Sequence, residues 1–118
     1  MEKDRPRPDL TPTAAEGRRL GFAVTLESRP AGWITLTPVG RHRLRVRGAV
    51  LPDCRGRGVA TAALGQVCAL LGRRLAGTGL VAWVDVADGA AQRVLEHNGF
   101  RCADVSRRPL RFHRRLSA

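Results

Sequence analysis

The sequence predicts one α/β (α+β) domain whose elements follow the order βββαβαββ. Three runs in the N-terminal half alternate apolar and polar residues, which is the period of a half-buried strand. Two later runs repeat apolar residues every three or four positions, the period of a helix with one buried face. A continuous apolar run lies between these helices and is typical of a strand buried on both faces. A chain of 118 residues is long enough for one such domain, which we place at 21–118.

The first three strands are predicted at 21–27, 33–39 and 44–51. Turn residues separate them, with Pro30 and Gly32 in the first turn. In the third run, Leu44 and Val46 share one face and arginines alternate with them on the other. Gly48 interrupts this run, which predicts either a bulge or a close approach of two backbones.

The first helix is predicted to begin at Val59 and to end before Gly77 and Gly79. Arg73 and Arg74 are expected in its last turns, where cations oppose the negative end of the helix dipole. Its apolar positions are those expected to face the core.

The buried strand is predicted at 80–87, and Asp88 is placed to cap the second helix. Gly99 is expected to end that helix. Its inward positions are Ala91, Val94 and Leu95. Two final strands, at 100–106 and 110–116, are expected to be joined by a short turn.

Residues 1–20 form a charged, proline-rich stretch that predicts a poorly ordered arm with at most one short helix. Its composition is unlike a secretory signal, and no apolar run reaches membrane-spanning length. The three cysteines are widely separated and lack metal-ligand spacing, so we expect no metal and free thiols in a cytoplasmic protein.

The formal net charge is +11, most of it from arginine. Such a charge favours either a polyanionic partner, namely nucleic acid or a phosphate-rich cofactor, or an arginine-rich solvated surface. The arginines are scattered and do not interleave with aromatic residues. The chain has no tyrosine, so recognition of nucleic acid by base stacking is disfavoured.

The run "PDCRGRGVAT" joins the third strand to the first helix. A helix N-terminus presents unpaired N–H groups to an anion, and glycines let the backbone approach a phosphate closely. Arg55 and Arg57 add positive charge. The run therefore predicts a phosphate-binding loop, although a tight strand-to-helix turn explains the same glycines. It matches neither the P-loop nor the GxGxxG pattern.

The run "RGRGVA" resembles [RQ]-x-x-G-x-[GA], the acyl-CoA pyrophosphate motif of the GNAT superfamily of acyltransferases. Downstream, "DGAAQRVLEHNGF" resembles a second GNAT segment in the matching order. The resemblance covers 21–105 and is closest to ribosomal-protein and protein N-terminal acetyltransferases. It implies a mixed sheet that splays after the strand 44–51, in a chain lacking most of the usual N-terminal strand and helices.

The resemblance also implies a set of site residues. Val50 and Leu51 would bind pantetheine through their main chains, and Asp88 would lie near the cofactor. A backbone N–H of Ala49 or Leu51 would polarise the acetyl carbonyl. The amides expected to hold the pyrophosphate belong to Arg55, Gly56, Arg57, Gly58, Val59 and Ala60.

One departure from the family concerns acid–base groups. Leu95 occupies the position at which many members carry a tyrosine that protonates the leaving thiolate. Candidates for a general base are Glu27, Asp85 and His97. Of these we choose Asp85, expected on the buried strand, although a strand-end carboxylate paired with one of the many arginines is the commoner explanation of such a residue. Cys54 has no base beside it and is expected to be a spectator.

These features predict an N-acyltransferase that moves an acetyl group from acetyl-CoA to an amine by direct attack in a ternary complex. The acceptor is a protein N-terminus, a peptide or a small molecule. Two alternatives stay open: a non-catalytic acyl-CoA-binding module and a basic nucleic-acid-binding domain. No membrane partner is expected, nucleic acid is expected to bind only non-specifically, and the oligomeric state is open, a homodimer included.

Overall fold

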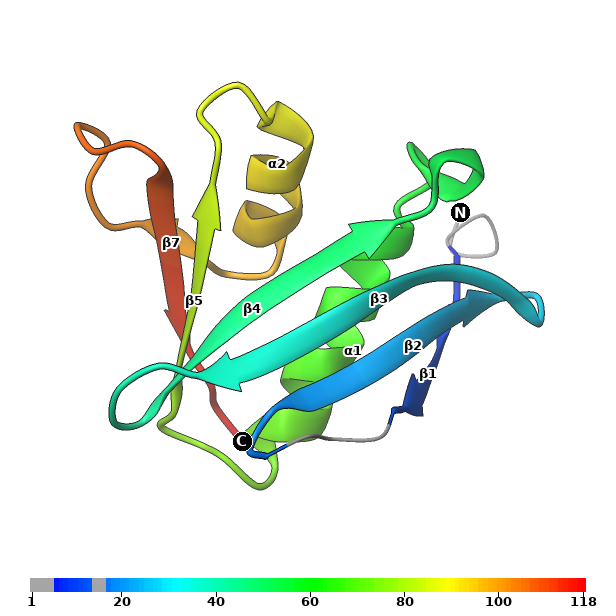
Figure 1. Ribbon diagram of the computed structural model, residues 1–118, viewed down its shortest axis with the longest axis horizontal. Helices are drawn as coiled ribbons and strands as arrows, with labels where there is room; N and C mark the ends of the chain where they lie inside the picture. Colours follow the sequence, from blue (N-terminus) through cyan, green and yellow to red (C-terminus); the bar gives the residue numbers. More distant parts are fainter. Residues whose placement is uncertain (1–5, 14–16) are drawn as a thin grey trace.

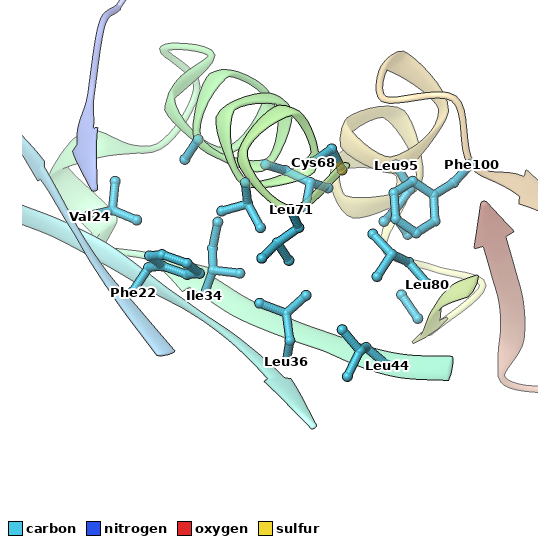
Figure 2. Packing of buried hydrophobic residues seen from close by; sticks show 14 of the residues in the cluster. Phe22, Val24, Ile34, Leu36, Leu44, Cys68, Leu71, Leu80, Leu95 and Phe100 are labelled. Carbon is cyan, nitrogen blue, oxygen red and sulfur yellow. The ribbon is translucent and has the colours of Figure 1, made fainter. Parts of the chain in front are cut away.

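A computed structural model describes residues 6–13 and 17–118. Its strands form one sheet in the order β1-β2-β3-β4-β5-β7-β6, with both helices packed together on one face (Figures 1 and 2). The elements are β1 (Asp9–Pro12), β2 (Leu20–Leu26), β3 (Arg29–Pro38), β4 (Arg43–Val50), the 3-10 turn η2 (Pro52–Cys54), α1 (Val59–Gly72), β5 (Gly79–Val84), α2 (Gly89–His97), β6 (Arg101–Cys102) and β7 (Leu110–Arg115). This arrangement confirms the mixed α+β class.

The core lies between the sheet and the two helices (Figure 2). Alternate residues of each strand point into it, because successive side chains in a strand face opposite sides. Val67 of α1 is fully buried, as is Leu36 of β3. The predicted alternation in β4 is confirmed, since Leu44 is buried and Val46 packs against the core while the arginines between them are exposed.

The N-terminal stretch differs from the predicted arm. Its residues Asp9–Pro12 form the edge strand β1, which pairs antiparallel with β2. Leu10 packs against the core and Pro8 is buried, so this segment belongs to the domain. The described residues between Pro6 and Leu20 contain no helix, while 1–5 and 14–16 lie outside the described residues. Four strands therefore precede α1, because cross-strand pairing with β2 recruits a segment whose composition alone favours disorder.

The first turn lies earlier than predicted, and the register shift in this part of the sheet does not involve Gly48. The β2–β3 turn is made by Glu27 and Ser28, both with positive φ, and Pro30 and Gly32 lie within β3. The register shift falls between β2 and β3, next to Val24, and β4 pairs with β3 without interruption.

Of the two alternatives predicted for Gly48, a bulge or a close approach of two backbones, the structure confirms the close approach. A Cβ at Gly48 would lie 2.7 Å from the carbonyl oxygen of Trp33 on β3. That distance is too short for any side chain, so the glycine permits two neighbouring backbones to pair here.

Two elements end earlier than predicted. The helix α1 ends at Gly72, so Arg73 and Arg74 follow it. A Cβ at Gly72 would lie 2.1 Å from the Ser117 carbonyl oxygen, so the C-terminal segment packs directly against the helix end. β5 ends at Val84, and the expectation of burial on both its faces fails at Trp83, which is 42% exposed.

The C-terminal strands have the predicted order but unequal lengths, because β6 holds only two residues and the connection to β7 is a long loop. β7 lies between β5 and β6 and is antiparallel to both. In the described part of the chain, no helix is long and apolar enough to cross a bilayer.

Candidate functional site: a splayed sheet beside a glycine-rich loop

The strands β4 and β5 begin side by side and then diverge (Figure 1). They are parallel, and their last pair is Arg45 with Val81, although β4 continues to Val50 and β5 to Val84. We call this divergence the splay. It confirms the predicted separation of the sheet after the third predicted strand, and it leaves the end of β4 without a neighbour on one side.

Two hydrogen bonds define which β4 backbone groups face the splay. The Leu51 N–H donates to the Ala31 carbonyl at 2.7 Å, and the Val39 N–H donates to the Arg43 carbonyl at 3.0 Å. Odd-numbered residues of β4 therefore direct their backbone groups toward β3. On the other side, the Gly79 N–H donates to the His42 carbonyl at 2.8 Å.

The same alternation directs the N–H groups of Gly48 and Val50 into the splay, beyond the last β4–β5 pair. This corrects the expected polarising donors. The N–H groups of Ala49 and Leu51 face β3, because the uninterrupted register preserves the alternation along the whole strand. The predicted role of the Val50 main chain is compatible with its position, whereas the Leu51 N–H is already engaged.

The loop after β4 has the backbone shape expected of an anion site. Gly56 and Gly58 have φ values of 75° and 77°, in the left-handed region that favours glycine. Gly58 is the N-cap of α1, and the first bond of the helix runs from the Ala62 N–H to the Gly58 carbonyl at 3.1 Å. The N–H groups of Val59, Ala60 and Thr61 precede this bond and have no acceptor within the helix.

The charges around the loop favour an anion. Arg55 and Arg57 are exposed, and the first turn of α1 contains no acidic residue. The Arg55 Nε donates to the Val50 carbonyl at 3.0 Å, which holds this side chain at the end of the splay. Among the described residues, the acidic neighbour of the loop is Asp53, which lies in η2. A pyrophosphate therefore fits the guanidinium groups of this loop and the amides that have no acceptor within the helix.

The N-terminal segment runs beside the same loop. A Cβ built on Gly58 would lie 3.7 Å from the Pro6 Cγ, and the Gln66 Nε2 donates to the Pro8 carbonyl at 2.9 Å. Sequence reasoning missed this contact, because it joins two segments that are far apart in the chain.

The carboxylates of Asp88 and Asp85 make different local hydrogen bonds, one at the start of α2 and the other in the turn after β5. The predicted cap is confirmed, since the Asp88 Oδ1 accepts from the Ala91 N–H at 3.0 Å. Asp85 is not on β5 as expected but in the exposed turn after it, where its Oδ1 accepts from the Ala87 N–H at 2.8 Å. The carboxylate holds this turn, which explains its place without a buried strand or an ion pair.

The other two candidates for a general base are exposed, whereas the position of the family's tyrosine is in the core. Leu95 is buried, as predicted. His97 is exposed at the end of α2, and Glu27 is exposed in the β2–β3 turn. Cys54 is a buried free thiol beside the loop. Across residues 6–13 and 17–118, no three His, Cys, Asp or Glu side chains gather as metal ligands.

Asn98 joins the two helices, and the sequence analysis did not single it out. Its Nδ2 donates to the Thr61 carbonyl at 3.1 Å and to the Val94 carbonyl at 2.9 Å. A Cβ on Gly65 would lie 3.1 Å from the Asn98 Oδ1, so a small residue in α1 permits this approach. The amide thus ties α2 to the first turn of α1, next to the glycine-rich loop.

Comparison with known proteins gives a consistent result. Residues 1–100 match the sequence profile described as "Acetyltransferase (GNAT) family". No curated protein matches the chain.

Solved structures share the fold at low sequence identity. RimJ of Mycobacterium smegmatis, in complex with CoA-disulfide, has a TM-score of 0.70 and 23% identity over 84% of this chain and 54% of its own. PseH of Campylobacter jejuni, in complex with acetyl coenzyme A, has a TM-score of 0.71 and 15% identity over 86% and 71%. The dodecameric spermidine N-acetyltransferase of Vibrio cholerae has a TM-score of 0.71 and 15% identity over 86% and 67%. The chain thus spans about half the length of the RimJ chain.

Proposed function

The chain belongs to the GNAT acetyltransferase family, and from this premise we propose that it transfers the acetyl group of acetyl-CoA to an amine. The observation that carries the proposal is the junction of two features in one site. The glycine-rich loop offers amides to a pyrophosphate, and the adjoining splay offers the backbone of Gly48 and Val50 to the rest of the cofactor. A simple strand-to-helix turn explains the first feature but not the second.

In this proposal each part of the chain holds a different part of the cofactor. The amides from Arg55 to Ala60 bind the pyrophosphate together with the Arg55 and Arg57 guanidinium groups. The Val50 carbonyl accepts from the Arg55 Nε and has a second lone pair for a pantetheine amide. Asp88 uses one oxygen to cap α2, and its carboxylate has further acceptor capacity near the cofactor.

Bound acetyl-CoA supplies an activated thioester, to which the amine nitrogen forms a C–N bond while the C–S bond breaks and its electron pair leaves on sulfur. The N–H groups of Gly48 and Val50 stabilise the negative charge that develops on the carbonyl oxygen. Asp85, or water, takes the proton that the nitrogen loses. The departing thiolate needs no assigned acid, because alkyl thiols such as that of cysteine have a pKa of about 8.5. This accommodates Leu95 in the position of the family's tyrosine.

The test is release of free thiol from acetyl-CoA with a panel of amines that includes peptides with free N-termini, lysine side chains and polyamines. Mass spectrometry identifies the acetylated product. We expect turnover with at least one amine class. The variant Asp85→Asn then tests the proposed base alone, because asparagine keeps the oxygen that accepts from the Ala87 N–H. A loss of turnover and an altered pH profile at unchanged melting temperature support that role. An unchanged pH profile removes it.

A non-catalytic acyl-CoA-binding module is the second candidate, favoured by the buried Leu95 at the usual acid position. It predicts that CoA raises the melting temperature while no amine releases thiol. A nucleic-acid-binding domain predicts no response to CoA. Its affinity for nucleic acid would fall about 10³–10⁵-fold between 50 and 200 mM salt if several phosphates are contacted, so the three functions give different results.

A further inference from the structure

One face of the sheet carries no helix in the described part of the chain (Figure 1). Both helices pack on the opposite face, where the core lies (Figure 2). The uncovered face is rich in arginine along the strands that border the splay. We define the arginine face as Arg43, Arg45 and Arg47 of β4, Arg111 and Arg115 of β7, and Arg101 of β6, all exposed.

The strand register brings these arginines together. Arg45 pairs with Val81, which pairs with His113, which pairs with Arg101. Paired residues project from the same face of a sheet. In the same way, Arg43 pairs with Gly79, which pairs with Arg115. Trp83 pairs with Arg111. The arginines that looked scattered in the sequence therefore form one surface.

The two tryptophans of the chain also lie on this surface. Trp33 and Trp83 are 43% and 42% exposed, and both share the strand face of the arginines. The Arg45 guanidinium lies over the Trp83 ring, 5.2 Å from its centroid. A hollow of about 560 Å³ adjoins Trp83 and Arg111 at the end of β5.

Within the described chain, the arginine face has one acidic side chain close to it: Asp104 lines the hollow with Arg111, and hydrogen bonds from Ser106 together with the charge of Arg111 lower the pKa of that carboxyl. The ion pair found there joins Arg107 to Asp104 at the rim of the hollow. Asp9 lies on the same face but on β1, three strands away from β4. The face therefore attracts a polyanion and repels polyamines.

We propose that the amine acceptor is an acidic polypeptide that lies on the arginine face. The inference rests on the proposed function, because α1 and α2 cover the splay on the core side and leave the arginine face as the side from which an acceptor reaches it. A polypeptide is favoured over nucleic acid because it carries the aliphatic amine that this chemistry needs.

The spacing of the arginines agrees with this occupant. Arg43, Arg45 and Arg47 occupy alternate positions of one strand, so their side chains repeat every 7 Å or so, at about 3.4 Å per residue. An extended polypeptide presents alternate side chains at the same repeat. Glutamates at alternate positions can thus each meet one guanidinium, and the charge-assisted hydrogen bonds can be bidentate.

The test is a titration followed by tryptophan fluorescence, since Trp33 and Trp83 are the two tryptophans of the chain and both lie on the arginine face. The probe is a short peptide with a free N-terminus and glutamates at alternate positions. A peptide with lysines in place of the glutamates and a single-stranded oligouridine serve for comparison. We expect saturable binding of the acidic peptide and weaker binding of both others.

Two double variants distinguish an effect of the arginine face from an effect of the total net charge. Arg43→Gln/Arg47→Gln removes two charges from the face, and Arg73→Gln/Arg74→Gln removes two exposed charges after α1. We expect the first to weaken acidic-peptide binding at least about tenfold, as for loss of charge-assisted hydrogen bonds. The second should change it less than about twofold, as for exposed charges without a partner.

Equal losses in the two double variants, tighter binding of oligouridine than of the acidic peptide, or no binding of the peptide would each overturn the inference. The response of the melting temperature to CoA is measured on the same variants. A protein that responds to CoA and acetylates only neutral or basic amines refutes the inference and leaves the proposed function intact. A protein that binds the acidic peptide but transfers an acetyl group to no amine refutes the proposed function and with it the acceptor role, and leaves only the peptide-binding surface.

Discussion

Replacing Gly58 by alanine tests whether the loop before α1 binds a phosphate or only turns the chain. Gly58 has φ 77° and ψ 9°, and a left-handed conformation costs a residue with a Cβ about 1–2 kcal/mol. The new Cβ would lie 3.7 Å from Pro6, an ordinary contact, so the fold accommodates it. At about 4 °C per kcal/mol for a domain of this size, the melting temperature should fall by about 4–8 °C.

Gly40→Ala is the matched control. Gly40 has φ 68° and open space where its Cβ would stand, and it lies in the β3–β4 turn, at the opposite end of β4 from the loop. Its backbone strain is therefore similar, and the two variants should melt at similar temperatures without ligand. Only Gly58→Ala places a methyl group where phosphate oxygens approach the amides at the start of α1.

The assay is thermal unfolding with and without CoA. At a hundredfold excess over Kd, CoA adds about 2.7 kcal/mol to the free energy of unfolding, or about 10 °C in melting temperature. Gly40→Ala should keep this shift. A tenfold loss of affinity in Gly58→Ala removes about 1.4 kcal/mol, so about half of the shift disappears. If both variants keep the parent's shift, the glycines serve only the turn and the phosphate-binding argument is refuted.

Three further predictions concern the helices and the core. Leu95→Ala should lower the free energy of unfolding by about 2–5 kcal/mol, since the side chain is buried, while turnover per folded molecule stays unchanged; a selective loss of turnover in well-folded protein would show that Leu95 acts in the chemistry. Asp88→Ala should cost about 1 kcal/mol through the lost cap on α2, measured by urea unfolding, whereas Asp88→Asn, which keeps an acceptor oxygen, should cost less. Burial raises the pKa of the Cys68 thiol, opposed by the charge of Arg114, so the unfolded state releases this proton at lower pH. The contribution of the neutral thiol to the free energy of unfolding is therefore present below the ordinary thiol pKa and is lost as pH rises through the folded pKa. Urea unfolding should give a lower free energy of unfolding at alkaline pH than at pH 7, and Cys68→Ala should reduce this difference.

Local features could be predicted because they depend on residues that are near one another in the chain. The positive φ at Gly56 and Gly58, the start of α1 at Val59 and the cap by Asp88 all follow from glycine's freedom and from a carboxylate three residues before an N–H. The alternation of Leu44 and Val46 with arginines likewise follows from the period of a strand.

Interactions between distant segments were less accessible to sequence reasoning. The strand β1 exists because Asp9–Pro12 pairs with β2, although its proline-rich composition favours disorder. Asp85 was expected on a buried strand, but β5 ends at Val84 and the carboxylate closes an exposed turn. The strand β1 thus depends on a contact between distant segments, whereas the Asp85 turn is local and begins where the pairing of β5 with β7 ends, at Val84 and Leu110.

By itself the sequence determined the class of the fold, the loop that precedes α1, and the family, because these rest on local backbone preferences and short motifs. Only the tertiary structure decided that Gly48 and Val50, rather than Ala49 and Leu51, face the splay, since this depends on the register between β3 and β4. Only the structure gathered scattered arginines beside Trp83 on one uncovered face. The physical reason is that a side chain's neighbours across a sheet are set by strand pairing, which joins residues far apart in the chain.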